Sequence, residues 1–206
     1  MLRDLAVRDL LAAFSSPDPT PGGGSAAALS SAIGASLLMM VAALPKTRNG
    51  SPQDREALAA AGEVLAGIRE RLAAAIDDDT AAYDGVVAAY RLPKASADEQ
   101  SARKAAIQGA LRTATDVPLG VMKESARALE QAAIVAAHGY KSASSDIGVA
   151  VALLTAGATG ANLNVDVNLA SIGNEAYRGT VRAEARDLMD QVGAMARRAE
   201  DLLRVD

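Results

Sequence analysis

Residues 19–44 of the chain read PTPGGGSAAALSSAIGASLLMMVAAL, and this stretch decides which kind of fold the chain forms. Two prolines stiffen the approach to three glycines, a residue type that allows backbone angles that residues with a Cβ avoid. Ser25 is a natural helix N-cap and predicts a helix of small and apolar residues from Ser25 to Leu44, ended by Pro45. The loop amides then lie in front of a helix N-terminus, where partial positive charge favours anions.

The glycine loop, which we define as Gly22-Gly23-Gly24-Ser25, has two interpretations. It is either a tight turn between two packed helices or a ligand-binding loop from which side-chain bulk has been removed. It is not a Walker loop, because no Gly-Lys-Ser/Thr follows, and it is not a dinucleotide fingerprint, because no strand precedes it. We expect the loop to line a substrate cleft.

Composition favours a bundle of closely packed helices. The length predicts one domain covering residues 1–206. Half of the residues are hydrophobic, yet the chain has only four tyrosines, one phenylalanine and no tryptophan. Alanine, glycine and serine must therefore fill the core, so the helices have to approach one another closely to reach native packing density.

Charge and cysteine content exclude several classes of function. A net charge of -4 and an isoelectric point near 5.1, with no basic cluster, argue against nucleic acid as a partner. The absence of cysteine excludes disulfides, thiolate metal sites and a cysteine nucleophile, and a single histidine, His138, makes a zinc site a poor expectation. The acidic N-terminus lacks a signal-peptide core, so we expect a cytoplasmic protein.

Two runs without charged residues, 19–45 and 147–165, are long enough to suggest membrane spans. Both are rich in glycine and in serine or threonine, and part of the first run is loop. We interpret them as buried central helices of a soluble bundle and expect no membrane partner.

Helical periodicity and capping signals cover almost the whole chain, and no convincing set of strands appears. The predicted fold is all-α, a multihelical bundle with long central helices. The expected helices run over Leu2 to Phe14, Ser25 to Leu44, Pro52 to about Tyr90, Ser96 to about Thr113, Thr115 to near Gly139, Ser144 to about residue 161, and about Asn174 to Leu203.

Residues 162–169, NLNVDVNL, alternate polar and apolar side chains with a period of two. If this stretch is extended, its four polar side chains share one side. The pattern fits an isolated edge strand or polar linker, and it fits equally well a row of amide and carboxylate groups facing a cleft.

Asp79 occupies a position where the helical spacing demands a core residue. The apolar heptad of its helix runs Leu58, Leu65, Leu72, Asp79, Val86. A carboxylate on a buried stripe is costly unless it is paired, and desolvation raises its pKa toward the range that suits acid–base catalysis. Two explanations of Asp79 involve no catalysis. The carboxylate pairs with an Arg or Lys across a helix interface, or the apolar stripe reaches the surface at this point.

Four further groups are weaker candidates than Asp79. Tyr83 lies four residues further on and shares its side of the helix. Lys94, just past the helix end, either supplies a cation to the same region or is an ordinary surface lysine. Asp146 opens a helix after Ser144 and Ser145, where it is either a capping residue or a functional carboxylate. His138, near a helix C-terminus, fits a capping or dipole role.

Four separated motifs of the chain are residues 19–28, 77–84 with 88–94, 145–150 and 162–169. Together they resemble the formiminotransferase-cyclodeaminase C-terminal domain family, which includes stand-alone methenyltetrahydrofolate cyclohydrolases. The resemblance covers nearly the whole chain in the right order, and nothing resembles the formiminotransferase domain. The family pattern has asparagine-rich residues before its Ser-Asp motif, where this chain has GYKSASSD at 139–146.

The resemblance implies an all-helical homodimer that acts on one-carbon units carried by tetrahydrofolate. By this resemblance we expect an enzyme that uses no metal and no cofactor beyond the tetrahydrofolate substrate. Cyclodeaminases convert 5-formiminotetrahydrofolate to 5,10-methenyltetrahydrofolate and ammonia, and cyclohydrolases interconvert the methenyl and 10-formyl forms. Both reactions pass through a tetrahedral carbon between N5 and N10 and need proton transfers. We expect a cyclodeaminase, with a cyclohydrolase and a catalytically silent folate-binding or structural paralogue as alternatives.

The resemblance also assigns residues. A pterin ring offers donors that an Asp or Asn matches in pairs, which gives the polar row a use. The expected catalytic residues are Asp79, Lys94 and Asp146. The expected substrate-binding residues are Gly22, Gly23, Gly24, Ser25, Tyr83, Asn164 and Asp166.

Overall fold

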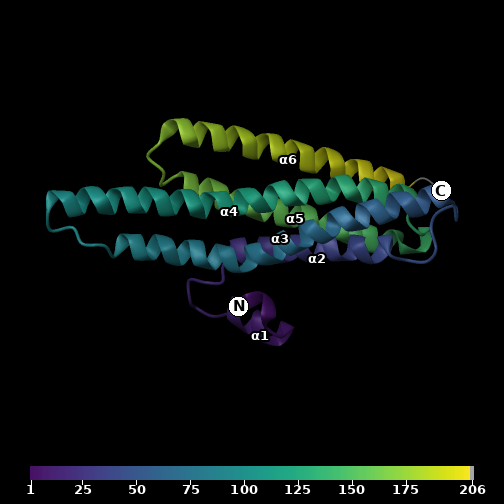
Figure 1. The fold of residues 1–206 in the computed structure, drawn as a ribbon, viewed down its shortest axis with the longest axis horizontal. Coiled ribbons are helices and arrows are strands. Elements are labelled where there is room, and N and C mark those ends of the chain that lie inside the picture. The colour runs from purple at the N-terminus through teal and green to yellow at the C-terminus, as the bar shows by residue number, and fades with distance from the viewer. Residues whose placement is uncertain (205–206) are drawn as a thin grey trace.

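Five long helices lie side by side along one axis of the molecule (Figure 1). The structure, a computed structural model, describes residues 1–204. Within that range no strand forms, and a single isolated bridge pairs Thr47 with Gly139, so the all-α prediction is confirmed. The elements are η1 (Leu2–Asp4), α1 (Val7–Phe14), α2 (Gly23–Ala42), α3 (Pro52–Tyr90), α4 (Ala97–His138), η2 (Lys141–Ala143), α5 (Ser144–Leu169) and α6 (Glu175–Arg204).

The starts of α3 and α4 follow from their capping residues. Ser51 accepts a hydrogen bond from the amide of Asp54 at 3.1 Å, with Pro52 at the first helical position. Ser96 and Glu99 form a capping box at the start of α4. These two starts lie where the sequence predicted them.

Small residues let α2 and α5 pack closely in antiparallel directions. A Cβ on Gly34 would lie 2.9 Å from the carbonyl oxygen of Ala150, and a Cβ on Gly157 would lie 2.7 Å from the carbonyl oxygen of Ala27. Any larger residue at either glycine would force the helices apart. Around this crossing the core is filled by alanines and by large aliphatic side chains such as Leu38, Leu65, Leu129 and Leu154, all fully buried.

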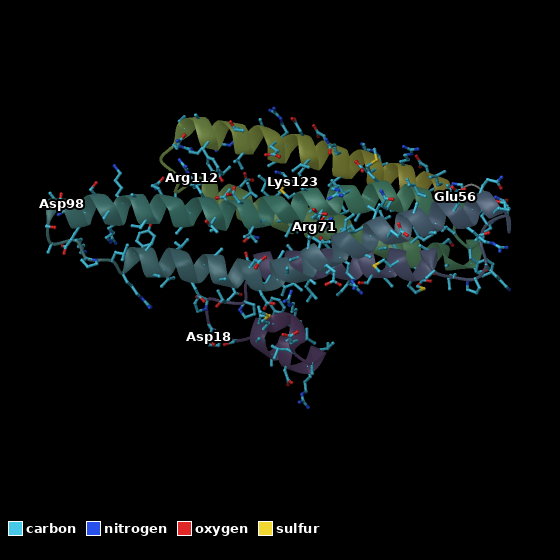
Figure 2. The ribbon with its side chains drawn as sticks, in the orientation of Figure 1. Asp18, Glu56, Arg71, Asp98, Arg112 and Lys123 are labelled. Carbon is cyan, nitrogen blue, oxygen red and sulfur yellow. The ribbon has the colours of Figure 1, made fainter. Side chains whose placement is uncertain are left out.

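Polar contacts between α3, α4 and α6 lie on the outer surface (Figure 2). Arg71 of α3 pairs with Glu124 of α4 at 2.8 Å, and Lys123 of α4 pairs with Glu184 of α6 at 2.7 Å. Exposed pairs of this kind contribute about 0–1 kcal/mol each. They therefore help to align the helices, while the apolar core supplies most of the stability.

The predicted break between Thr113 and Thr115 is wrong, because α4 continues through Pro118 without interruption. Proline lacks the amide that would donate to the carbonyl of Ala114 four residues earlier. Asn168 of α5 donates its Nδ2 proton to that carbonyl at 2.6 Å. The hydrogen bond that proline removes from the helix is thus replaced by a side chain from a neighbouring helix.

The extended conformation that alternation suggested for residues 162–169 is also wrong. The stretch forms the last two turns of α5. Its buried side chains, Val165 and Leu169, continue a spacing of four residues from Ala161 just before it, so the core selects the helical period over the period of two. Asn164 is half-buried and donates to the carbonyl of Gly160 at 2.8 Å, whereas Asp166 is exposed.

The two uncharged runs form α2 and most of α5. By length and composition α2 and the segment Lys141–Leu169 would each suffice to cross a membrane, but 50% and 39% of their most apolar windows are buried inside the protein. Each helix thus has one side in the core, as predicted for central helices, and one side that the protomer leaves uncovered.

Candidate functional site

Asp79 reaches from α3 to the first turn of α2. Its Oδ2 accepts a hydrogen bond from the amide of Ser25 at 2.8 Å. The Ser25 hydroxyl lies 3.1 Å from the same carboxylate oxygen and 2.8 Å from the carbonyl oxygen of Ile76, so the two acceptors compete for its single proton. The first amides of a helix have no partner inside the helix. Asp79 therefore caps α2 from a neighbouring helix.

The prediction that Ser25 is the N-cap is wrong by three residues. The helix begins at Gly23, and Gly22 is the N-cap, in an extended conformation and without a side chain to cap with. Ser25 sits inside the first turn and is fully buried. Glycine at the cap position leaves the orphan amides to the carboxylate of Asp79, which explains why a serine cap is not needed here.

Packing restricts the three glycine positions of the loop to different degrees. A Cβ on Gly24 would overlap the Asp79 carboxylate, so only glycine lets this carboxylate approach the helix backbone. Cβ atoms on Gly22 and Gly23 would make ordinary contacts, the nearest atoms being the carbonyl oxygen of Pro19 at 3.7 Å and Nδ2 of Asn164 at 3.6 Å. Close packing therefore requires glycine only at position 24.

Burial raises the pKa of Asp79 above its ordinary value, and the hydrogen bonds from Ser25 act in the opposite direction. Within residues 1–204 no Arg or Lys forms an ion pair with this carboxylate, in contrast to the cross-helix partner that we considered. The positive end of the α2 helix dipole, rather than a cationic side chain, faces the Asp79 carboxylate. The resulting group is a half-buried carboxylate whose neutral form is favoured more than in water.

Three helices meet at what we call the Asp79 site. Asp79 comes from α3, Gly23 to Ser25 come from α2, and Asn164 comes from α5 beside Gly23. Thr80 joins them, with its hydroxyl 3.5 Å from that of Ser25. The sequence analysis missed Thr80, for which adjacency to Asp79 was the only available signal.

The other predicted site residues lie at the rim or farther away. Tyr83 is one turn from Asp79 on α3 and is 41% exposed. Asp166 is exposed two residues after Asn164, which turns it to a different side of α5.

Lys94 and Asp146 are separated from the Asp79 site within one chain. Lys94 lies in the exposed turn between α3 and α4, at the far end of a helical hairpin that extends past the other helices (Figure 1). Asp146 is in the first turn of α5. It precedes Asn164 by 18 residues, which is roughly 27 Å along a helix. The three expected catalytic residues are not assembled by one protomer.

Two cavities of the protomer are lined by residues other than those around Asp79. One of about 980 Å³ runs between α4 and α6, with Ile134, His138 and Met195 in its wall. Another of about 240 Å³ is lined by Lys94, Arg103 and Lys104 with Gln100, Ile107 and Gln108. Neither of these two cavities includes Asp79, Ser25 or Asn164.

A second buried carboxylate, which the sequence analysis missed, is Asp54 at the start of α3. It accepts hydrogen bonds from Nδ1 of His138 at 2.8 Å and from the amide of Asn49 at 2.9 Å. These bonds hold the pKa of Asp54 well below its usual range. His138, expected to serve its own helix terminus, instead ties the end of α4 to the start of α3.

Comparison with known proteins shows which family this chain resembles. The profile of the formiminotransferase-cyclodeaminase family matches residues 6–187. The methenyltetrahydrofolate cyclohydrolase of Methylorubrum extorquens is 39% identical over 192 residues, which is 93% of this chain and 92% of that protein. The formimidoyltransferase-cyclodeaminase of Sus scrofa is 28% identical over 190 residues, and the chain spans only 35% of its length.

A solved structure has the same fold. The crystal structure of formiminotetrahydrofolate cyclodeaminase from Thermotoga maritima superposes with a TM-score of 0.87 over 98% of both chains, at 24% sequence identity. The family profile and the relative of matching length together give the assignment: the chain belongs to the formiminotransferase-cyclodeaminase family.

Proposed function

We propose that this protein hydrolyses 5,10-methenyltetrahydrofolate to 10-formyltetrahydrofolate, with Asp79 as the group that transfers protons. The observation that carries the proposal is the half-buried Asp79 carboxylate, held at the α2 N-terminus without a cationic side chain. The named relative of the same length supports the reaction type, because it is a methenyltetrahydrofolate cyclohydrolase 39% identical to this chain. That likeness moves this reaction ahead of the cyclodeaminase that the motifs alone favoured.

The reaction needs one base and one acid at the same carbon. Water adds to the methenyl carbon, which then carries N5, N10 and a hydroxyl group. Cleavage of the bond from this carbon to N5 leaves the formyl group on N10 and a hydrogen on N5, with one proton released overall. Asp79, ionised, would accept the proton of the attacking water and would then return it to N5 as that nitrogen leaves.

The first turn of α2 supplies a second element of the proposed mechanism. The amides of Gly23 and Gly24 lie in the first turn and have no acceptor inside the helix. Together with the positive end of the helix dipole they would stabilise negative charge on the oxygen of the tetrahedral carbon. The amide of Asn164, beside Gly23, is suited to hydrogen bond the polar edge of the pterin.

Cyclodeamination is the second candidate, and the formimidoyltransferase-cyclodeaminase relatives favour it. In that reaction N10 attacks the formimino carbon of 5-formiminotetrahydrofolate, and ammonia leaves after it receives a proton. The same carboxylate would serve, as the base for N10 and the acid for ammonia.

Parallel steady-state assays of the purified chain distinguish the candidates. Loss of the methenyl chromophore in the presence of 5,10-methenyltetrahydrofolate reports hydrolysis, and its appearance from 5-formiminotetrahydrofolate, with ammonia release, reports cyclodeamination. The uncatalysed rate of each substrate is subtracted. We expect a higher kcat/KM for hydrolysis. Binding of both folates without turnover of either would identify a catalytically silent paralogue and overturn the proposal.

A further inference from the structure

The cavity of about 240 Å³ near the tip of the α3–α4 hairpin has a positively charged wall. Three cations line what we call the hairpin cavity, together with two glutamines and one apolar side chain: Lys94, Arg103, Lys104, Gln100, Gln108 and Ile107. No carboxylate is part of this wall. Within residues 1–204 neither lysine forms an ion pair, although the whole chain has a net charge of -4. A concave surface with unpaired cations attracts an anion.

Arg103 is held at this cavity by contacts with α3. Its Nε and Nη2 donate to the carbonyl oxygen of Tyr90 at 3.2 and 2.9 Å, and its guanidinium carbon lies 5.5 Å from the centre of the Tyr90 ring. The acids of the same turn do not neutralise it. Glu99 accepts two backbone amides at 2.7 and 2.9 Å, and Asp98 is exposed and does not line the cavity. A guanidinium positioned in advance loses less side-chain entropy when it binds an anion.

One side of α3 leads from the Asp79 site to the hairpin cavity. Tyr83 follows Asp79 by four residues and Tyr90 follows it by eleven, so the three side chains share one side of the helix. α2 begins beside Asp79, and the α3–α4 hairpin extends past the other helices (Figure 1). The stripe is therefore open beyond Asp79, where Tyr83 is 41% and Tyr90 is 50% exposed.

Helix α5 leads to the same cavity from Asn164. The chain passes from Asn164 to Ser171 in seven residues, roughly two helical turns. There Gln108, a residue of the cavity wall, donates its Nε2 proton to the carbonyl oxygen of Ser171 at 3.2 Å, and its Oε1 accepts the amide proton of Gly173 at 2.7 Å. Two elements of the Asp79 site thus end at one cavity, so a single elongated ligand can touch both places.

The proposed substrates are elongated in the required way. N10 of the folate carries a benzoyl ring, which ends in an amide to glutamate, and this glutamate carries two carboxylates. Each further γ-linked glutamate adds one carboxylate. Tyr90, which holds Arg103, lies eleven residues beyond Asp79, roughly 16 Å along the helix. A folate with its methenyl carbon at Asp79 therefore extends its carboxylates toward the cations.

Resting on the proposed function, we propose that the hairpin cavity binds the glutamate carboxylates of the folate substrate, with Arg103 and Lys104 as its specificity-determining cations. The benzoyl ring lies along Tyr83 and Tyr90, whose exposed rings give it an aromatic contact. Arg103 and Lys104 donate charge-assisted hydrogen bonds to the carboxylates. Both candidate reactions use a substrate with this tail, so the subsite does not depend on which of them the chain catalyses.

Two substrates that differ only in the tail test the subsite. The ratio of kcat/KM for 5,10-methenyltetrahydropteroyl-triglutamate to that for tail-less 5,10-methenyltetrahydropteroate measures what the tail contributes. We expect a ratio well above one for the wild type. Lys104 is exposed, and Lys104→Gln should lower the ratio about twofold to fivefold, the scale of one exposed ion pair, through a higher KM for the triglutamate.

Charge reversal and a matched control sharpen this measurement. Lys104→Glu should lower the ratio further than Lys104→Gln, because its carboxylate repels the tail. Arg182→Gln removes an exposed cation of α6 that does not line the cavity, and it should keep the wild-type ratio. An unchanged ratio in both Lys104 variants would overturn the proposal.

A binding measurement needs no turnover. p-Aminobenzoyl-triglutamate contains the ring and the tail but no pterin, and calorimetry gives its Kd. Lys104→Gln and added salt should both weaken its binding, since exposed charges are screened. Asp79→Asn should bind this fragment as the wild type does, because Asp79 lies outside the hairpin cavity.

The outcomes separate this inference from the proposed function. Fragment binding that Lys104→Gln weakens, in a chain that turns over neither folate, would keep the tail subsite and reject the proposed function. Turnover in which the triglutamate and the tail-less substrate react equally well would reject the tail subsite and keep the proposed function. Inorganic phosphate that binds as tightly as the fragment would assign the cavity to a small free anion and would also overturn the tail subsite.

Discussion

The Asp79 carboxylate caps the helix that begins at Gly23 by accepting the amide proton of Ser25 at 2.8 Å. A carboxylate at a helix N-terminus is usually a stabilising feature. Here burial raises its pKa, so the ionised carboxylate is less favourable in the folded chain than in water, despite the hydrogen bonds from Ser25. Because Asp79 is both the cap of α2 and the proposed base, it links the folding of α2 to the chemistry that we propose.

Gly24→Ala and Gly23→Ala form a matched pair. A methyl group at position 24 would overlap the Asp79 carboxylate, so we expect Gly24→Ala to lower the free energy of unfolding by about 1–3 kcal/mol and to reduce kcat. At position 23 the methyl group meets only Asn164 at an ordinary distance, so the melting temperature should stay nearly unchanged while KM rises. If Gly23→Ala binds folate normally, the loop serves packing alone.

The rate of hydrolysis should depend on the ionisation of Asp79. As a base Asp79 must be deprotonated, so kcat should rise with pH, with a midpoint above the ordinary aspartate value of 3.8 because burial raises its pKa. The neighbouring exposed residue gives the control, and Asp78→Asn should retain the same profile. A midpoint at or below 3.8, or one that persists in Asp79→Asn, would assign the titration to another group.

Asp54 should control stability rather than activity. Its folded-state pKa lies below its unfolded value of 3.8, so its ionised form stabilises the fold above that pH, and the contribution fades as pH falls from 3.8 toward the folded value. Asp54→Asn should lower the melting temperature at pH 7, and the difference from wild type should shrink below about pH 4. An equal difference at both pH values would reject the explanation that these hydrogen bonds stabilise the fold through ionised Asp54.

Asn168 should contribute to the stability of the fold, because Pro118 lies inside α4 and leaves a carbonyl without its helical donor. Asn168→Ala leaves the half-buried carbonyl of Ala114 without this donor, and we expect a cost of about 1 kcal/mol, the low end of the range for a group left unsatisfied. Asn168→Asp keeps the shape but, once ionised, has no proton to donate, so it should be at least as unstable. Urea denaturation measures both variants. Wild-type stability in Asn168→Ala would mean that water replaces the side chain.

Sequence patterns predicted the fold class because capping residues and helical periodicity act locally. Ser51 and Ser96 mark two helix starts correctly. The errors at Pro118 and at residues 162–169 have one cause, since both depend on how α4 and α5 meet. Asn168 satisfies the carbonyl that proline leaves free, and no local pattern reveals a contact between residues 54 positions apart.

The candidate site was predictable to a similar degree. Asp79 stood out as a carboxylate in an apolar heptad, and the structure places it beside the predicted glycine loop. The reason for Gly24 was hidden, because it depends on where α3 crosses α2. Lys94 and Asp146 carry family motifs, but one chain holds them far from Asp79, and their roles remain predictions.

The most direct test of this account is the kcat of Asp79→Asn for 5,10-methenyltetrahydrofolate, measured with its thermal unfolding and with Asp78→Asn as control. Asparagine keeps an oxygen that accepts the Ser25 amide but transfers no proton. We therefore predict a folded variant, at least as stable as wild type at pH 7, whose kcat falls by about 10²-fold or more, while Asp78→Asn stays active. A folded Asp79→Asn variant with near wild-type kcat would contradict the account.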